Sequence, residues 1–169
     1  MKKMAGFVAL HMSKMRGKKI SILDIGSRNN VDSKSDSRTY KELFSDENWN
    51  YVGMDICPGD NVDIVVTDMY HWNIESESYD VVISGQTFEH IEYFWLTMQE
   101  IYRVLKPMGL VCIIAPSTGN EHRHPKDCWR FYADGLKAMA TYAKLEIIEA
   151  VITHDDSTWN DAVLIAKKK

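Results

Sequence analysis

The sequence predicts an α/β fold built on a doubly wound, seven-stranded sheet that is mostly parallel and ends in an antiparallel hairpin strand. Apolar segments rich in Val and Ile alternate with segments whose apolar residues recur every three or four positions, as in alternating strands and helices. The last two strand-like segments are separated only by HDDSTWND, which is too short for a parallel crossover. We therefore expect parallel strands first and an antiparallel pair at the C-terminal end.

Most of the expected strands are nearly continuous in Val, Ile and Leu, as in strands that are covered on both faces. They span residues 20–25, 51–55, 62–67, 79–84, 110–115, 145–153 and 161–167. Helical periodicity predicts helices over 37–45, 91–105 and 134–143, and a short helix within residues 1–18. The short helix should bury Phe7, Val8, Leu10 and Met15. Pro107 and Gly109 should end the 91–105 helix and turn the chain into the next strand.

Length and composition limit the class of protein. The 169 residues fit one domain spanning 1–169. A net charge of −4 and a pI of about 5.8 argue against holding a nucleic-acid backbone as the main function. No apolar run approaches the roughly 20 residues that span a bilayer, so no membrane partner is expected.

The cysteines point to a reducing compartment. Cys57, Cys112 and Cys128 form no CxxC pair, which favours reduced thiols and a cytoplasmic location, with Cys112 in the core. No set of Cys and His has zinc-finger spacing, and no metal is expected. A metal-assisted mechanism that uses His and Asp is an alternative, which no ligand spacing in the sequence requires.

Three acidic residues end three successive strands. Asp24 lies in ILDIG, where Gly26 lets a ligand approach the backbone, although the GxGxxG dinucleotide fingerprint is absent. Asp55 ends the second strand and could accept hydrogen bonds from ribose hydroxyls, or simply cap the next element. Asp68 ends the third strand and could reach an adenine amino group, or be an exposed turn residue. Ligands of open α/β sheets bind at these carboxyl ends, so we expect a binding site there.

The fourth strand leads into a loop that can carry acid–base chemistry. In YDVVISGQTFEHI, residues 79–91, an apolar run is broken by Ser84, Gly85 and Gln86, and Glu89 and His90 follow before the next helix. This loop is expected to form another wall of the same site.

Taken together, these motifs resemble those of class I S-adenosylmethionine-dependent methyltransferases. ILDIG, YVGMDI, VTDM and YDVVISGQTFEHI look like the first four motifs, and RVLKPMGLVCIIAP is similar to the fifth, with Met108 in its usual Pro-Gly-Gly turn. The resemblance covers residues 19–168. It implies a Rossmann-like fold, S-adenosyl-L-methionine as cofactor, S-adenosyl-L-homocysteine as product and a small-molecule substrate.

The resemblance also implies roles for particular residues. The methionine part of the cofactor would lie against the turn after the first strand, the ribose against the end of the second, the adenine against the third, and the sulfonium beside the fourth. The implied cofactor-binding residues, in that order, are Asp24, Gly26, Ser27 and Arg28, then Asp55 and Ile56, then Asp68 and Met69, and then Ser84, Gly85 and Gln86. Residues 27–30 replace the usual further glycines, and Arg28 could fill the pocket or contact the cofactor carboxylate. A degenerate relative that kept the fold and lost catalysis is therefore an alternative.

A polar insertion, PSTGNEHRHPKDCWRF, follows the fifth strand at residues 116–131. Its His-Pro-x-Asp-x-Trp-Arg-Phe run is similar to one in a subset of small bacterial and phage-type methyltransferases. We expect Arg123, Asp127 and Arg130 to bind an anionic or hydroxyl-rich substrate. Alternatively, Asp127 and Arg130 form a local salt bridge. Trp129 and Phe131 are expected to pack the loop onto the core.

Methyl transfer from a sulfonium is an in-line displacement, in which the enzyme aligns the nucleophile and can remove its proton. For a hydroxyl acceptor, histidine is the natural base. We expect His90 first and His122 or His124 second, although His90 could instead be a helix-start residue bonded to the backbone. Glu89 is expected to position the cofactor or cap the helix.

The sequence thus predicts a methyltransferase acting on a small polar acceptor, by O-methylation of a sugar-like or other metabolite. Acceptor specificity would come from the loop at 29–38, the loop at 116–131 or a second subunit of a homodimer. The alternative is a cofactor-binding or scaffold protein. The missing GxGxxG and the final hairpin argue against an NAD-dependent oxidoreductase. SGQT in place of an Asn/Asp-Pro-Pro-aromatic tetrad argues against methylation of nucleic-acid bases.

Overall fold

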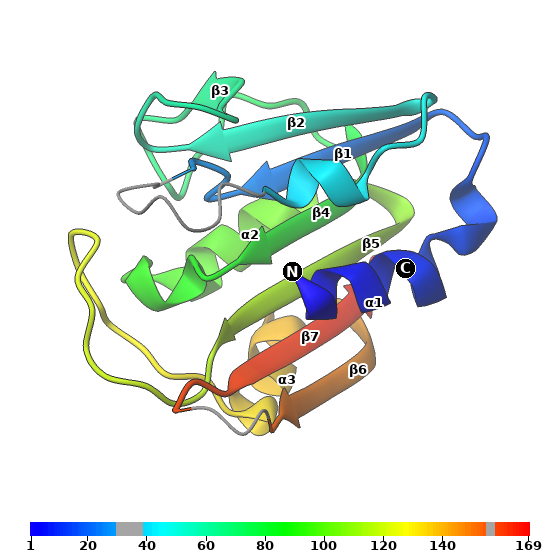
Figure 1. Ribbon diagram of the computed structural model, residues 1–169. Coiled ribbons are helices and arrows are strands. Elements are labelled where there is room, and N and C mark those ends of the chain that lie inside the picture. Colours follow the sequence, from blue (N-terminus) through cyan, green and yellow to red (C-terminus); the bar gives the residue numbers. More distant parts are fainter. Residues whose placement is uncertain (30–38, 155–157) are drawn as a thin grey trace.

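The computed structural model describes residues 1–29, 39–154 and 158–169, and in these residues seven strands form one sheet. Their order across the sheet is β3-β2-β1-β4-β5-β7-β6 (Figure 1). The strands are β1 (Ile20–Ile25), β2 (Trp49–Asp55), β3 (Ile64–Val65), β4 (Tyr79–Gly85), β5 (Leu105–Pro116), β6 (Glu146–Thr153) and β7 (Asp161–Lys167). β1 to β5 pair in parallel, and β7 runs antiparallel to both β5 and β6. The predicted fold class is confirmed.

The strand order reverses between β1 and β4. The chain proceeds from β1 outward to β2 and β3, and then returns to place β4 on the other side of β1. In open α/β sheets, a ligand crevice forms at the carboxyl ends of strands at such a switch point. Here those ends are Ile25 in β1 and Gly85 in β4.

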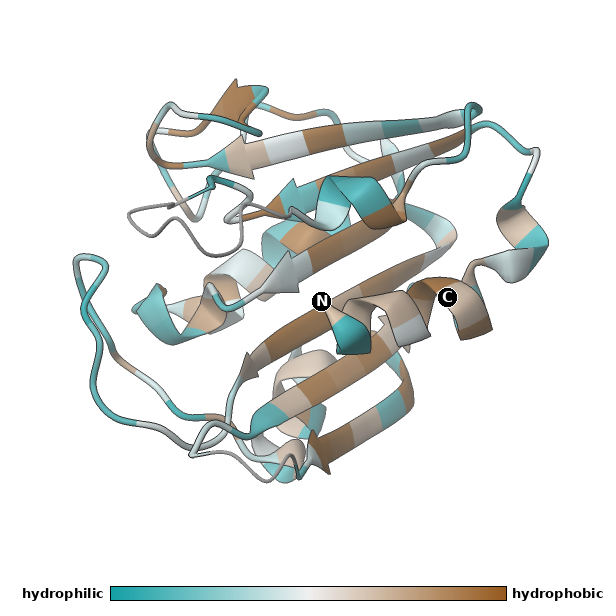
Figure 2. Ribbon diagram, viewed as in Figure 1, coloured by the Kyte–Doolittle hydropathy of each residue, from teal (hydrophilic) through white to brown (hydrophobic). Residues whose placement is uncertain are grey.

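Helices cover both faces of the sheet (Figure 1). On one face lie α1 (Lys2–His11) and the short 3₁₀ helices η1 (Ser13–Met15) and η2 (Tyr40–Leu43). The other face carries α2 (Phe94–Val104) and α3 (Ala133–Tyr142), and η3 (Phe88–His90) connects β4 to α2. Figure 2 shows hydrophobic residues concentrated in the central strands and a largely hydrophilic loop after β5.

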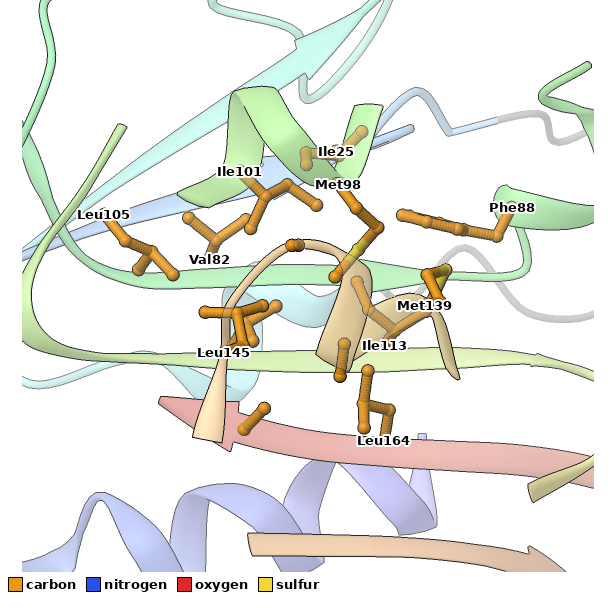
Figure 3. Packing of buried hydrophobic residues seen from close by; sticks show 14 of the residues in the cluster. Ile25, Val82, Phe88, Met98, Ile101, Leu105, Ile113, Met139, Leu145 and Leu164 are labelled. Atoms are coloured by element: carbon orange, nitrogen blue, oxygen red, sulfur yellow. The ribbon is translucent and has the colours of Figure 1, made fainter. Parts of the chain in front are cut away.

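Each face of the sheet buries its own hydrophobic cluster. In Figure 3, the side chains of Val82 in β4 and Ile113 in β5 lie on the face of the sheet that carries Met98 and Ile101 of α2. All four side chains are fully buried. Burial of such residues stabilises the sheet by about 1.5–3 kcal/mol per side chain. The site described below is built on the carboxyl edge of this sheet.

Several element bounds differ from the predictions. β3 is limited to Ile64–Val65, because this edge strand pairs with one neighbour only, and its preceding residue Asp63 instead bonds Gly53 through both backbone and side chain. The predicted turn at Pro107 and Gly109 lies within β5 and does not end the helix. α2 ends at Val104 and β5 begins at the next residue, but the register of β5 with β4 shifts before Leu110, and Met108 has a φ of +66°.

Near the N-terminus, Phe7 and Val8 are buried as predicted, but Leu10 is 76% exposed, so its predicted burial is wrong. Leu10 falls on the solvent side of α1, whose buried face is Met4, Phe7 and Val8. Of the helix predicted over 37–45, the described part contains the turn η2. Residues 30–38, most of the predicted specificity loop, and 155–157 of the hairpin connection lie outside the described residues. No helix in the described part is long and apolar enough to cross a membrane.

Candidate functional site

Two cavities lined by described residues open at the carboxyl edge of the sheet. The larger has a volume of about 700 Å³ and lies between the ends of β1 and β2 and the loop after β5. The smaller measures about 220 Å³ and lies beside Asp24 and Tyr40. Both cavities are lined by Gly26 and Arg28, so an elongated ligand could run from one to the other past the turn after β1.

The turn after β1 depends on glycine. Gly26 has φ of +75°, and a Cβ atom there would lie 2.1 Å from Oγ1 of Thr87. Gly85, which lines the smaller cavity, is constrained by space alone, because its Cβ would lie 2.2 Å from the Tyr40 hydroxyl oxygen. Both positions therefore bring backbone to the cavity wall where a side chain would not fit. The sequence analysis did not anticipate Tyr40 or Thr87 in this role.

Asp24 lies at the wall of the smaller cavity and is 3% exposed. Burial raises the pKa of Asp24 to about 7, although the Tyr51 hydroxyl donates a hydrogen bond to its carboxylate. Asn61 donates to the Tyr51 oxygen at 3.3 Å and to the Ser27 carbonyl at 2.9 Å, and Ser27 Oγ donates back to the Asn61 carbonyl at 2.8 Å. This network fixes the turn that carries Gly26.

Asp55 lines the larger cavity and also accepts hydrogen bonds from nearby backbone N–H groups. Its carboxylate accepts the backbone N–H of Cys57 at 3.0 Å and that of Arg28 at 3.3 Å. An ionised carboxylate has about four acceptor positions, so two remain for a ligand hydroxyl. The two interpretations from the sequence, capping and ligand binding, are thus compatible.

Of the other cofactor-binding residues implied by the resemblance, some line a cavity and some do not. Ile56, Met69 and Gln86 line the larger cavity, and Ser27 lines the smaller one. Ser84 is fully buried and donates its hydroxyl to the Ile25 carbonyl at 2.9 Å. Asp68 is exposed and accepts the Tyr70 N–H at 2.8 Å, as the turn alternative expected. Ser84 and Asp68 therefore lie outside the lining of both cavities.

The 116–131 loop folds back onto η3. The N–H groups of Cys128 and Trp129 donate to the Glu89 carbonyl at 2.7 and 3.2 Å, and the Trp129 indole donates to the Ile91 carbonyl at 3.0 Å. The rings of Trp129 and Phe131 pack edge-on against Phe94, with centroid distances of 5.4 and 5.2 Å. These two side chains hold the loop against the core, as predicted.

The charged residues of this loop pair with one another. Arg130 donates to both carboxylate oxygens of Asp127, at 2.6 and 2.7 Å, and these bonds hold the pKa of Asp127 well below its ordinary range. Arg123 pairs with Glu121, and its side chain is 72% exposed. All three predicted substrate-binding residues, Arg123, Asp127 and Arg130, lie outside the lining of the two cavities. Their substrate-binding role stays a prediction, and the alternative salt bridge is present.

The three histidines proposed as bases do come together. His90, His122 and His124 line the larger cavity, with ring centroids 5.0, 5.8 and 6.1 Å apart. His90 Nδ1 is hydrogen-bonded to the Lys126 carbonyl, the backbone contact that the alternative reading of His90 expected. Burial lowers the pKa of His90.

Glu89 stands behind these histidines. Its side chain is fully buried, and burial raises its pKa to about 7. Its Oε1 lies 3.6 Å from Nε2 of His90 and 3.8 Å from Nε2 of His122. Glu89, His90 and His122 form a group that could hold a metal ion. The sequence showed Glu89 beside His90 but gave no signal that a distant loop would bring His122 to the same carboxylate.

Comparison with known proteins agrees with this architecture. Residues 36–113 match a family model described as a methyltransferase domain. None of the curated proteins matches the chain in sequence.

Solved structures share the fold at low sequence identity. An S-adenosylmethionine-dependent methyltransferase of Methanosarcina mazei is 14% identical, with a TM-score of 0.67 over 93% of this chain and 96% of that one. The 1,6-didemethyltoxoflavin-N1-methyltransferase of Burkholderia thailandensis, crystallised with 1,6-didemethyltoxoflavin and S-adenosylhomocysteine bound, is 14% identical, with a TM-score of 0.74 over 99% of this chain and 77% of that one. The [4+2]-cyclase SpnF is 15% identical, with a TM-score of 0.74 over 98% and 80%.

The family match spans β2 to the middle of β5, and the remaining strands complete the seven-stranded sheet that was expected from the motifs. Residues 36–113 are thus similar to methyltransferase domains, and the chain as a whole shares the fold of solved S-adenosylmethionine-dependent methyltransferases.

Proposed function

We propose that this protein transfers a methyl group from S-adenosylmethionine to an oxygen of a small polar acceptor, such as a sugar-like metabolite. The observation that carries the proposal is that His90, His122 and His124 line the larger cavity. Gly26, in the turn after β1, lines the same cavity. A hydroxyl nucleophile needs a group that takes its proton, and imidazole is suited to this at neutral pH.

The residues present fit the cofactor. Gly26 and Arg28 line both cavities, so the cavities meet at this turn, and Asp24 and Asp55 place one carboxylate in the wall of each. Asp24 would face the ammonium group of the methionine part, Arg28 its carboxylate, and Asp55 the ribose hydroxyls. When bound, the cofactor supplies an electrophilic methyl group on a sulfonium. The chain's own task is to hold the acceptor in line and remove its proton.

Isothermal titration with S-adenosylmethionine tests the cofactor site. We expect binding to the wild type, a loss of about tenfold or more in Asp55→Asn, and unchanged binding in Asp60→Asn, an exposed acid in the same turn. Removing one charge-assisted hydrogen bond costs about 1.5–3 kcal/mol. Absence of binding to the wild type, or equal binding to both variants, would refute the cofactor site in this form.

Release of S-adenosylhomocysteine in the presence of acceptor panels then tests the oxygen acceptor. Matched pairs of hydroxylated and amino compounds should give turnover with the hydroxylated member. Selective turnover of amines would overturn the O-methylation proposal and leave the methyltransferase activity standing. The contrast between hydroxyl and amine acceptors is the one to test, because the similar Burkholderia protein is named as an N1-methyltransferase.

The second candidate is a cofactor-binding protein without methyl transfer. The observation in its favour is the turn after β1, where Ser27 and Arg28 stand in place of further glycines and Arg28 packs over Gly59. The similarity to SpnF, described as a cyclase, shows that this fold is not confined to methyl transfer. Cofactor binding without turnover of any acceptor in the panels would favour this candidate.

A further inference from the structure

The group formed by Glu89, His90 and His122 has the composition of a metal site. One ligand atom from each residue can be chosen so that all lie within 4.8 Å of one another. Glu89 and His90 come from η3, directly after β4, and His122 comes from the loop after β5. Two imidazoles and one carboxylate form a frequent ligand set of catalytic Zn²⁺ sites, which leave a further position open.

The distances are close to those of a bound ion. In a tetrahedral zinc site with bonds of about 2.0–2.1 Å, neighbouring ligand atoms lie about 3.3 Å apart. The Oε1 atom of Glu89 lies 3.6 Å from His90 Nε2 and 3.8 Å from His122 Nε2. Both distances exceed a hydrogen bond. Since all three ligand atoms lie within 4.8 Å of one another, the two imidazoles would move closer together when an ion is bound.

Glu89 supplies an independent sign that something is bound. Its side chain is fully buried, and neither carboxylate oxygen has a hydrogen-bond partner among the described residues. A buried polar group without a partner costs about 1–3 kcal/mol, and more when it is charged. A cation held between Glu89 and the two imidazoles would give the carboxylate oxygens a partner. It would also favour the ionised form of Glu89.

The Nδ1 atoms of His90 and His122, which would point away from the metal, have the kind of partners that metal-binding histidines have. Histidine ligands usually direct the ring nitrogen away from the metal toward a carbonyl or carboxylate, which fixes the tautomer. His90 Nδ1 meets the Lys126 carbonyl, and His122 Nδ1 lies 3.4 Å from Oδ2 of Asp127. With Nδ1 protonated in each ring, the Nε2 lone pairs are left to face Glu89.

The surroundings of His122 Nδ1 include one competing donor. Arg130 Nη2 also lies 3.4 Å from this nitrogen, but the carbonyl oxygen of Asn120 adds a second acceptor at 3.4 Å. Arg130 already makes short bonds to Asp127 and donates to the Asn120 carbonyl at 2.7 Å. Asp127, held by Arg130, is thus placed as the carboxylate partner of a metal-bound histidine.

We propose that Glu89, His90 and His122 bind a divalent transition metal, with Zn²⁺ as the reference ion, and that the open coordination position faces the larger cavity. His90 and His122 both line this cavity. An acceptor hydroxyl coordinated there would lose its proton more readily, because a bound Zn²⁺ lowers the pKa of an attached oxygen. With His90 and His122 holding the metal, His124, which lines the same cavity, is the imidazole left to take that proton. This use of the metal rests on the proposed methyltransferase activity, whereas metal binding itself does not.

The proposal is tested with untagged, chelator-treated full-length protein, titrated with Zn²⁺ in competition with a chromogenic chelator. We expect one ion per chain. Glu89→Gln and His122→Ala should each weaken binding about 100-fold or more, on the scale of ligand-shell losses. His71→Ala, which removes a histidine whose side chain is 86% exposed, should bind like the wild type. Co²⁺ in place of Zn²⁺ should give the visible spectrum of a nitrogen–oxygen site without a thiolate band.

A melting experiment guards against misfolded variants. Zn²⁺ should raise the Tm of the wild type and of His71→Ala, but not that of Glu89→Gln, which is nearly the same shape and should fold in the absence of metal. Stoichiometric binding that survives both ligand substitutions, or no binding to the wild type, overturns the proposal. S-adenosylmethionine titration of the chelator-treated protein separates the two proposals, because cofactor binding there does not depend on the metal.

Discussion

Glu89 Oε1 lies 3.6 Å from Nε2 of His90, and this carboxylate is fully buried. The two residues are adjacent in η3, but the hydrogen bond of His90 Nδ1 to Lys126 turns the other ring nitrogen toward the carboxylate. His122 then approaches the same oxygen from the loop after β5. An acidic group and two imidazoles are thereby concentrated at one wall of the larger cavity.

Glu89 should make the metal-free protein less stable as the pH rises. Burial raises its pKa from 4.5 to about 7 in the folded state. Between these values the unfolded chain releases the proton while the folded chain keeps it, so the free energy of unfolding falls with pH. Relative to Glu89→Gln, the wild type should lose on the order of 2–4 kcal/mol between pH 4.5 and pH 8.

Urea unfolding in a chelator at both pH values measures this difference. The comparison with Glu89→Gln is needed because Asp24, whose pKa is also raised to about 7, adds the same trend to both proteins. An identical pH dependence in the wild type and the variant would contradict the assignment to Glu89.

Tyr51→Phe should weaken both stability and cofactor binding. The Tyr51 hydroxyl donates to Asp24, and its removal leaves a buried carboxylate without that donor, at a cost of about 1–3 kcal/mol. The pKa of Asp24 should rise further, so at neutral pH less of the carboxylate would be available for a cationic ligand group. Thermal melting and titration with S-adenosylmethionine check both effects. Tyr132→Phe, at a side chain 65% exposed, should change neither.

Gly26→Ala should prevent cofactor binding and lower the Tm. The added methyl group would overlap Thr87, and φ of +75° is strained for a residue with a side chain. Gly135→Ala in α3 is the matched control, because no described atom outside its own stretch of helix lies within 4 Å of its Cβ position. This second change should stabilise the protein by about 0.5–1 kcal/mol, since alanine is the better helix former. Equal effects of the two substitutions would contradict the constraint at Gly26.

Trp129→Ala should loosen the loop at 116–131 and reduce kcat/KM for the acceptor more than the affinity for the cofactor. The substitution removes packing on Phe94 and the hydrogen bond to the Ile91 carbonyl. Trp129→Phe, which keeps an aromatic ring and loses the hydrogen bond, should have a smaller effect. Hydrogen exchange of the loop measures its opening directly. Unchanged exchange in Trp129→Ala would mean that other contacts hold the loop.

Much of the architecture followed from local sequence. Buried strands such as 20–25 and 161–167 were predicted with their observed bounds, because an apolar run between turn residues has few other structures available to it. The antiparallel end followed from the length of one connection, since eight residues cannot cross over a sheet. The positions of Asp24, Asp55 and the Ser84–Gln86 turn at strand ends came from the same pattern.

The bounds of β3 at the sheet edge and the junction between α2 and β5 could not be predicted from local sequence. β3 is short because edge pairing decides its length. β5 begins before Pro107 because Leu105 pairs with Tyr79 of β4. Further along, Lys168 donates to the Gly109 carbonyl, and Met108 donates to that of Lys168. Such pairings depend on strands that are distant in the chain, so no local pattern contains them.

The sequence by itself determined the fold, the strand-end acids and the set of residues able to do chemistry. Only the tertiary structure decided which of those residues meet. It brought His122 of the loop after β5 to Glu89 of η3, and it left Asp127 and Arg130 outside the lining of both cavities. The reason is physical: a side chain's partners and its desolvation are set by packing between segments far apart in sequence, and these decide its charge and its chemistry.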